Sequence, residues 1–205
     1  MSTSVRRTCP VCHRLARPRN RFCAAHGNRL SRYGDPAAVP LTYRTHVTRR
    51  YGRWIADGYR RLHDHPAMQA GRELAERCLN YTYVPDPNAV RVRAWTEAAR
   101  MVQTLRDAGV TPEQLMLRVA ELFAVFEMEP SRCRNRAAED MALGKAVMHL
   151  VQWRGSGQGQ SKTTALAVAA HVREHLGAWA IAFVRKLNAD QGALNDVKRR
   201  AATFD

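Results

Sequence analysis

The stretch TPEQLMLRVAELFAVF, residues 111–126, carries the clearest structural signal in the chain. Thr111 and Gln114 stand three residues apart with a proline between them, which is the pattern of a capping box at the start of a helix. Apolar side chains then recur every three to four residues, at Leu115, Val119, Leu122, Phe123 and Phe126. The stretch therefore predicts a helix that begins after Thr111 and buries one face.

The segments that precede this stretch show the same helical period. We expect one helix from about Thr45 and a second over residues 66–83. A third is expected over residues 87–109, with Asp86 as its N-terminal cap and a proline at its first position.

The segments that follow it are also helical in period. Ser131 is expected to cap a helix whose apolar stripe runs to residue 151. Apart from a short hairpin near the N-terminus, no strand pattern is found, and the fold class is predicted to be all-α. The stripe of the last helix comprises Leu176, Trp179, Ala180, Phe183 and Leu187.

Residues 9–36, CPVCHRLARPRNRFCAAHGNRLSRYGDP, contain three of the five cysteines. Cys9 and Cys12 form a Cys-x2-Cys pair, and ten residues later Cys23 and His26 form a Cys-x2-His pair. Two such pairs can surround one Zn²⁺ ion, which takes four nitrogen or sulfur ligands in a tetrahedron. Because four protein ligands leave no open position, we expect one structural zinc ion rather than a catalytic one.

Two alternatives compete with this ligand set. His13 is a rival ligand, but it directly follows Cys12, where its side chain would be badly placed to share the ion. The other alternative is a disulfide-bonded loop, yet nothing else in the chain indicates an oxidising compartment. Cys78 and Cys133 lie in helical patterns and are expected to be buried free thiols. The cysteines therefore indicate zinc in a reducing cytoplasm.

The hydropathy of the chain predicts no targeting or membrane segment. The first ten residues contain no apolar run, so no secretory signal is expected. The longest nearly apolar stretches, 165–170 and 176–184, fall far short of a membrane span. We expect a cytoplasmic protein that does not contact membranes.

Positive charge is concentrated at the front of the chain. The net charge is +15, and residues 1–54 supply +11 of it through twelve arginines and a single acid, Asp35. A guanidinium can bind phosphate with two hydrogen bonds, stack on bases or read guanine edges. With a zinc module and interleaved aromatic residues, this favours a nucleic-acid partner over an inert solvated surface. The candidate contacts are Arg14, Arg17, Arg19, Arg21, Arg29, Arg32, Arg44, Arg49, Arg50 and Arg53.

The Cys-x2-Cys pair, followed by FCAAHGNRLSRYGDP at residues 22–36, resembles the small treble-clef zinc module of phage and other mobile-element proteins. That module often precedes HNH-type nuclease domains. The resemblance covers about the first 36 residues and implies that Cys23 and His26 lie on the first turn of a short helix. It does not carry over a catalytic activity.

The residues themselves also predict this helix, over residues 21–33. Gly34 is a natural left-handed stop, and Pro36 blocks continuation. Arg29 and Arg32 are then neighbours on one helix face, which is suited to a groove or to phosphates. The predicted organisation is a zinc module at 1–36, a linker at 37–45 and a multi-helix domain at 46–205.

Two motifs resemble enzyme signatures but are incomplete. GSGQGQSKTT, residues 155–164, has Ser161 where a phosphate-binding loop needs glycine, so a flexible linker is expected near 155–162. HVREH, residues 171–175, matches a zinc-hydrolase pattern, but no glutamate follows Glu174 to supply the usual third ligand. We expect an ordinary helix there.

A nuclease site is also not predicted. His63, Asp64 and His65 lack a further histidine at a suitable distance, and Glu139 and Asp140 are expected to point in different directions. The leading interpretation is a non-enzymatic, zinc-containing nucleic-acid-binding protein of phage or mobile-element type, acting on DNA. Its helical body would offer a surface to a protein partner or a second copy. The alternatives are an adaptor docking on host polymerase or replication machinery and, less favoured, a metal-dependent nuclease.

Overall fold

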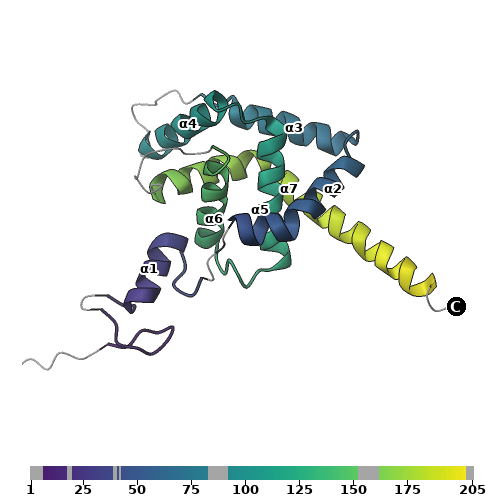
Figure 1. Ribbon diagram of the computed structural model, residues 1–205. Coiled ribbons are helices and arrows are strands. Elements are labelled where there is room, and N and C mark those ends of the chain that lie inside the picture. Colours follow the sequence, from purple (N-terminus) through teal and green to yellow (C-terminus); the bar gives the residue numbers. More distant parts are fainter. Residues whose placement is uncertain are drawn as a thin grey trace, which may run out of the picture.

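The computed structural model describes residues 7–17, 20–38, 41, 43–82, 92–151 and 162–201 (Figure 1). The described residues contain no strand, and their only strand-like pairing is an antiparallel bridge between Thr8 and Leu15. The predicted all-α class is confirmed. The elements are α1 (Ala24–Tyr33), the π-helix η1 (Tyr43–Gly52), α2 (Arg53–Arg61), α3 (Pro66–Leu79), α4 (Val92–Asp107), α5 (Pro112–Met128), α6 (Arg136–Met148) and α7 (Lys162–Ala201).

Helix α5 lies at the centre of the core. It contacts η1, α2, α3, α6 and α7. A helix surrounded in this way must be apolar on more than one stripe, and α5 buries Met116, Ala120, Ala124 and Val125 in addition to the predicted positions. The capping box is confirmed: Thr111 Oγ1 accepts from the backbone N–H of Gln114 at 3.2 Å, and Gln114 Oε1 accepts from that of Thr111 at 3.0 Å.

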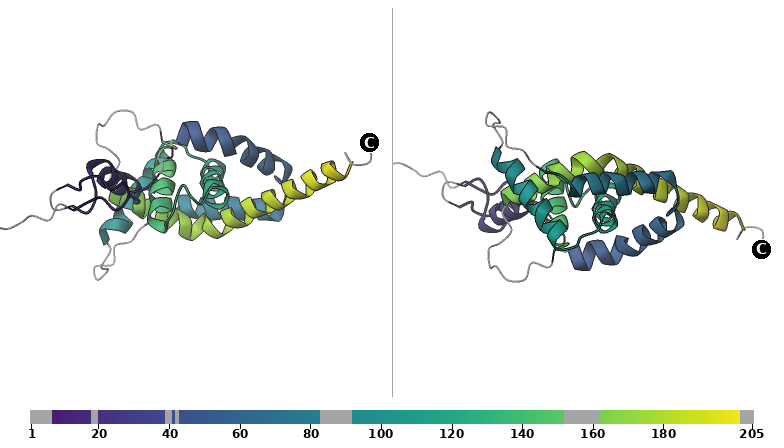
Figure 2. Two further views of the ribbon diagram at one scale, coloured as in Figure 1. Left: turned by 90° about the horizontal axis from the view of Figure 1, so that it is seen from below. Right: turned by 90° about the horizontal axis from the view of Figure 1, so that it is seen from above.

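Helix α7 is the longest element, with 40 residues and a length of about 60 Å at 1.5 Å per residue. Its N-terminal part packs against α3, α4, α5 and α6. Its C-terminal part projects beyond the bundle, at the end of the molecule opposite the N-terminal segment (Figure 2). The predicted stripe is confirmed, with Leu176, Trp179, Ala180, Phe183 and Leu187 all buried.

Two predicted helix starts were wrong. The cap of α6 is Asn135, whose Oδ1 accepts from the backbone N–H of Ala138 at 2.9 Å, and not Ser131. After α5 ends, a turn that buries Cys133 delays the next helix. Helix α1 begins at Ala24 rather than at residue 21, because the backbone of Cys23 is extended. Asp86 and Pro87 lie outside the described residues.

Candidate metal centre and basic surface

Three sulfurs and one imidazole converge near the N-terminus. One ligand atom from each of Cys9, Cys12, Cys23 and His26 lies within 4.8 Å of all the others. A reversal of the chain with a left-handed residue, His13 at φ 57°, brings the first two cysteines together. Cys23 caps α1, and His26 lies in its first turn. This cluster can hold a metal ion, as predicted.

The distances within the cluster fit a tetrahedral ion. The sulfurs of Cys12 and Cys23 are 3.7 Å apart, and His26 Nδ1 lies 3.4 Å from the sulfur of Cys9 and 3.2 Å from that of Cys23. A zinc ion with Zn–S of about 2.3 Å and Zn–N of about 2.0 Å separates such ligand pairs by about 3.8 and 3.5 Å. All five cysteines are free, so the disulfide alternative is not seen. His13 is exposed and is not part of the cluster.

The cysteine pKa values differ within the cluster. Burial tends to raise the pKa of Cys9, but hydrogen bonds from the backbone of Cys23, Val11 and Cys12 outweigh it and lower the value to about 6. A backbone hydrogen bond from Arg14 lowers the pKa of Cys12, whereas burial and the neighbouring thiols raise it by more. The thiolate is the form of cysteine that binds metals, and the lowered pKa of Cys9 favours its thiolate at neutral pH.

The end of α1 rests on α6. Lys145 Nζ donates a hydrogen bond to the backbone carbonyl of Arg32, and its ammonium lies 5.1 Å from the centre of the Tyr33 ring. Gly34 ends α1 at φ 73°, as predicted, and a side chain there would meet the carbonyl oxygen of Ala137 at 2.8 Å. These contacts link the Cys/His segment to the helical body.

Most of the candidate arginines point to solvent without an acidic partner. Arg29 is half-buried, and the others whose side chains are described are exposed. Arg19 and the side chain of Arg44 lie outside the described residues. No ion pair to a described residue is formed by Arg14, Arg17, Arg21, Arg29, Arg32, Arg49 or Arg53.

Arg50 is the exception. Its Nε lies 3.1 Å from Glu129 Oε1, and the same carboxylate accepts a hydrogen bond of 2.6 Å from the hydroxyl of Tyr51. This hydrogen bond and the burial of the ring raise the pKa of Tyr51 to about 12, with burial the larger cause. Because Glu129 also binds Arg132, its single negative charge offsets only part of the charge of Arg50.

Arginines of the helical body are paired much more often. Examples are Arg72 with Glu113, Arg118 with Glu121, Arg136 with Asp140 and Arg185 with Glu127. An unpaired guanidinium adds its full charge to the surface field, whereas a paired one adds little. The positive field of the described residues therefore originates mainly around the Cys/His cluster and along η1 and the start of α2.

Glu139 and Asp140 were expected to point in different directions, and the structure corrects this. Both reach Arg173 of α7, which donates to Glu139 Oε2 at 3.0 Å and to Asp140 Oδ1 at 2.9 Å. The planar fork of a guanidinium is wide enough to hold two neighbouring carboxylates. The acid pair is thus an anchor between α6 and α7.

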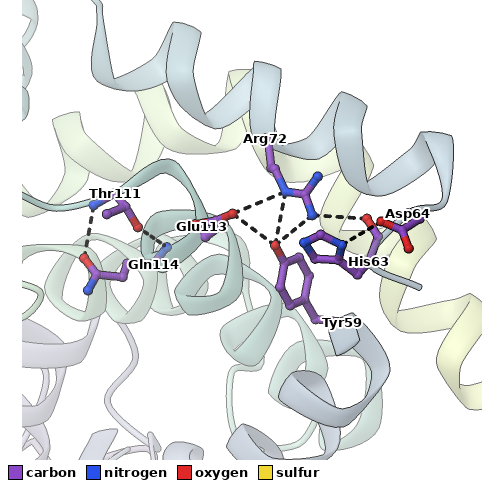
Figure 3. A network of polar contacts seen from close by, with 7 residues as sticks. All are labelled: Tyr59, His63, Asp64, Arg72, Thr111, Glu113 and Gln114. Carbon is purple, nitrogen blue, oxygen red and sulfur yellow. Dashed lines mark hydrogen bonds and ion pairs between the residues drawn. The ribbon is translucent and has the colours of Figure 1, made fainter. Parts of the chain in front are cut away.

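One of the two histidines between α2 and α3, His63, belongs to a polar network that joins α2, α3 and α5 (Figure 3). Arg72 donates to the hydroxyl of Tyr59 at 2.9 Å and to the carbonyl of His63 at 3.1 Å, and it lies 3.4 Å from Glu113. The His63 ring pairs with its exposed neighbour Asp64 through Nδ1, and it packs edge to face on the Tyr59 ring at 5.6 Å between centres. These contacts stabilise the corner between α2 and α3.

His65 has a different role at the same corner. It is the N-cap of α3, and its Nδ1 accepts a hydrogen bond from the backbone N–H of Ala67 at 3.1 Å. One ring nitrogen is thereby used in capping the helix.

The HVREH helix contains an arrangement that the sequence did not reveal. One ring nitrogen from each of His171 and His175 lies within 4.8 Å of the sulfur of Cys78, which belongs to α3. The sequence pattern directed attention to a third ligand downstream, whereas this one lies 93 residues upstream of His171. The only sequence signal for this ligand was Cys78 itself, a lone cysteine in a predicted helix.

The motif that resembles a phosphate-binding loop could not be assessed in the same way, because its residues 155–161 lie outside the described residues.

None of the helices in the described ranges is both long enough and apolar enough to cross a membrane. The main candidate functional features of the N-terminal part are the Cys/His cluster and the nearby arginines that form no ion pair to a described residue. No protein-family model, curated protein or solved structure matches this chain.

Proposed function

We propose that this chain is a non-enzymatic, zinc-containing nucleic-acid-binding protein that acts on DNA and originates from a phage or other mobile element. The observation that carries the proposal is the group of arginines that surrounds the Cys/His cluster and continues into η1 and α2, most of which form no ion pair to a described residue. The origin is supported by the resemblance of residues 9–36 to mobile-element zinc modules.

Zinc is the metal that this donor set favours. Three thiolates and one imidazole suit a borderline-soft ion without a strong geometric preference, and the spacing of the four atoms fits a tetrahedron. Cys9, Cys12, Cys23 and His26 would hold it with no open position for a substrate. The ion would therefore stabilise the module and keep its arginines in place, and it would perform no chemistry.

Phosphate is the ligand that the charges around α1 favour. The ammonium of Lys145 lies in the field of Arg32, and its pKa is lowered first by burial and second by that positive charge. Like charges held together raise the free energy of the folded protein, and a bound anion relieves this repulsion. Binding a nucleic-acid backbone across α1 and α6 would supply such anions.

The first test measures DNA affinity as a function of salt. If Arg29 and Arg32 contact phosphates, replacing both with alanine should reduce the log–log salt slope by about 0.9 for each contact on duplex DNA. The matched control is Arg136→Ala with Arg185→Ala, which removes the same charge from two exposed arginines that already have acidic partners. We expect the control to keep most of the slope.

Each failure of this test has a distinct meaning. Equal losses of slope in the two double variants would show that only net charge matters and would refute the contacts at α1. Tighter binding to RNA of the same sequence would refute DNA as the target. The absence of binding at low salt would refute the function and favour an adaptor that docks on polymerase or replication proteins.

A second test concerns catalysis. Purified protein with Mg²⁺ or Mn²⁺ is expected to leave DNA and nucleotides uncut, because His65 caps a helix and the carboxylates of Glu139 and Asp140 bind Arg173. Gel analysis of supercoiled and linear DNA provides the measurement. Cleavage that disappears in His63→Ala or His65→Ala would instead establish the nuclease alternative.

A further inference from the structure

A second group of metal-binding side chains lies inside the helical body, far along the chain from the N-terminal cluster. Cys78 near the end of α3 is 1% exposed, and His171 of α7 is fully buried. His175 stands one turn further along α7 and is half-buried. One ring nitrogen of each histidine and the Cys78 sulfur all lie within 4.8 Å of one another.

Hydrogen bonds to carbonyl groups determine which nitrogens of the two rings carry hydrogen. Nε2 of His171 lies 3.0 Å from the carbonyl oxygen of Cys78, and Nδ1 of His175 lies 3.0 Å from that of His171. A carbonyl can only accept, so both of these nitrogens must be donors. In a neutral ring the opposite nitrogen then keeps its lone pair. Histidines that bind metals show this pattern, in which one nitrogen donates to a carbonyl and the other is free for the ion.

The free nitrogen of His171 is an unusual feature of the core. Nδ1 is buried and has no hydrogen-bond partner among the described residues. A buried polar atom without a partner is rare in folded proteins and calls for an explanation such as an ion. The pKa of His171 is lowered, and burial is the largest of the several causes. Burial therefore favours the neutral ring, which is the form that binds metals.

The two rings are arranged so that they can share a ligand. Their centres are 4.5 Å apart, because residues four apart lie on the same face of a helix. Two histidines at this spacing are a recurrent way for a helix to grip zinc. The thiol comes from a different helix, so an ion bound here would link α3 to α7.

We propose that Cys78, His171 and His175 form a second metal site, which binds one ion of the zinc class. Sulfur and imidazole donors select borderline-soft transition metals over Mg²⁺ or Ca²⁺. Three protein ligands leave one coordination position for water, in contrast to the closed N-terminal cluster. The site is independent of the proposed nucleic-acid function.

The metal content of the full-length protein tests this site. Elemental analysis of protein purified without chelators should give two zinc ions per chain, falling to one in Cys78→Ala and in His175→Gln. Cys133→Ala is the matched control, because Cys133 is also a buried thiol but belongs to no Cys/His cluster of the described residues, and burial is the main cause that raises the pKa of both thiols to about 12. This control should keep both ions.

Cobalt spectroscopy separates the two sites. A variant with Cys9→Ser and Cys12→Ser has lost two ligands of the first site, yet it should still show thiolate-to-cobalt absorption when titrated with Co²⁺. Adding Cys78→Ala or, should that variant fold poorly by circular dichroism, His175→Gln should abolish the absorption. A single zinc per chain that survives Cys78→Ala, together with no cobalt absorption in the double-serine variant, would overturn the proposal. One zinc ion per chain in the unaltered protein that is lost in Cys78→Ala would instead refute the N-terminal ligand set.

Discussion

Chelation, or the substitution Cys12→Ser, is expected to unfold the N-terminal module while the helical body stays folded. The module has little apolar burial to stabilise it: α1 contains no fully buried residue, and Leu15 is 59% exposed. The conformational entropy lost when a segment of this length is ordered is far larger than such contacts return. Structural zinc contributes about 10 to 16 kcal/mol to small metal-dependent modules, so its loss removes the main stabilising term.

Metal analysis measures the loss of the N-terminal ion, and circular dichroism measures how much of the helical structure remains. Cys12→Ser should lose the N-terminal ion and keep most of the helical signal, because α1 is short beside the core helices α3 to α7. DNA affinity should fall as well, since the arginines of the module lose their fixed positions.

The control for this experiment is Cys133→Ala, which removes a buried cysteine outside the cluster. It should lower the stability of the body without releasing the N-terminal ion. Less than one zinc bound through Cys9, Cys12, Cys23 and His26 would refute the ligand set. Unfolding of the whole chain in Cys12→Ser, which removes only an N-terminal ligand, would refute the independence of the two parts.

Gly144→Ala is expected to cause the largest loss of stability in the body. A methyl group at this position of α6 would lie 1.9 Å from the carbonyl oxygen of Ala165 and 2.6 Å from its carbonyl carbon. These are backbone atoms of α7 and cannot rotate away, so the two helices would have to separate. Overpacking in a core costs about 1 to 3 kcal/mol and sometimes more, and we expect about 3 kcal/mol here.

Thermal unfolding provides the measurement for Gly144→Ala. For a chain of this size a loss of about 3 kcal/mol corresponds to a decrease in Tm of about 6 to 12 °C. Gly192→Ala makes the same change in helix α7 where nothing lies within 4 Å of the added carbon. Because alanine favours helices over glycine by about 1 kcal/mol, this control should be neutral or stabilising. Similar Tm values for the two variants would show that α6 and α7 do not approach as closely as described.

Features that depend on neighbouring residues could be predicted from the sequence. The capping box at Thr111, the left-handed stop at Gly34 and the Cys/His pairs each involve groups a few residues apart, whose geometry is set by the backbone between them. The same holds for the buried stripe of α7, because a period of 3.6 residues places its members on one face.

The interactions of individual charges could be determined only by the tertiary structure. Arg50 looked like a phosphate contact, yet Glu129 from the end of α5 pairs with it, and Arg173 from α7 brings Glu139 and Asp140 together. The cluster of Cys78 with His171 and His175 arises in the same way. Local sequence determines which residues share a helix face, but the packing of one helix on another determines which faces meet, and these contacts join residues at least 33 positions apart.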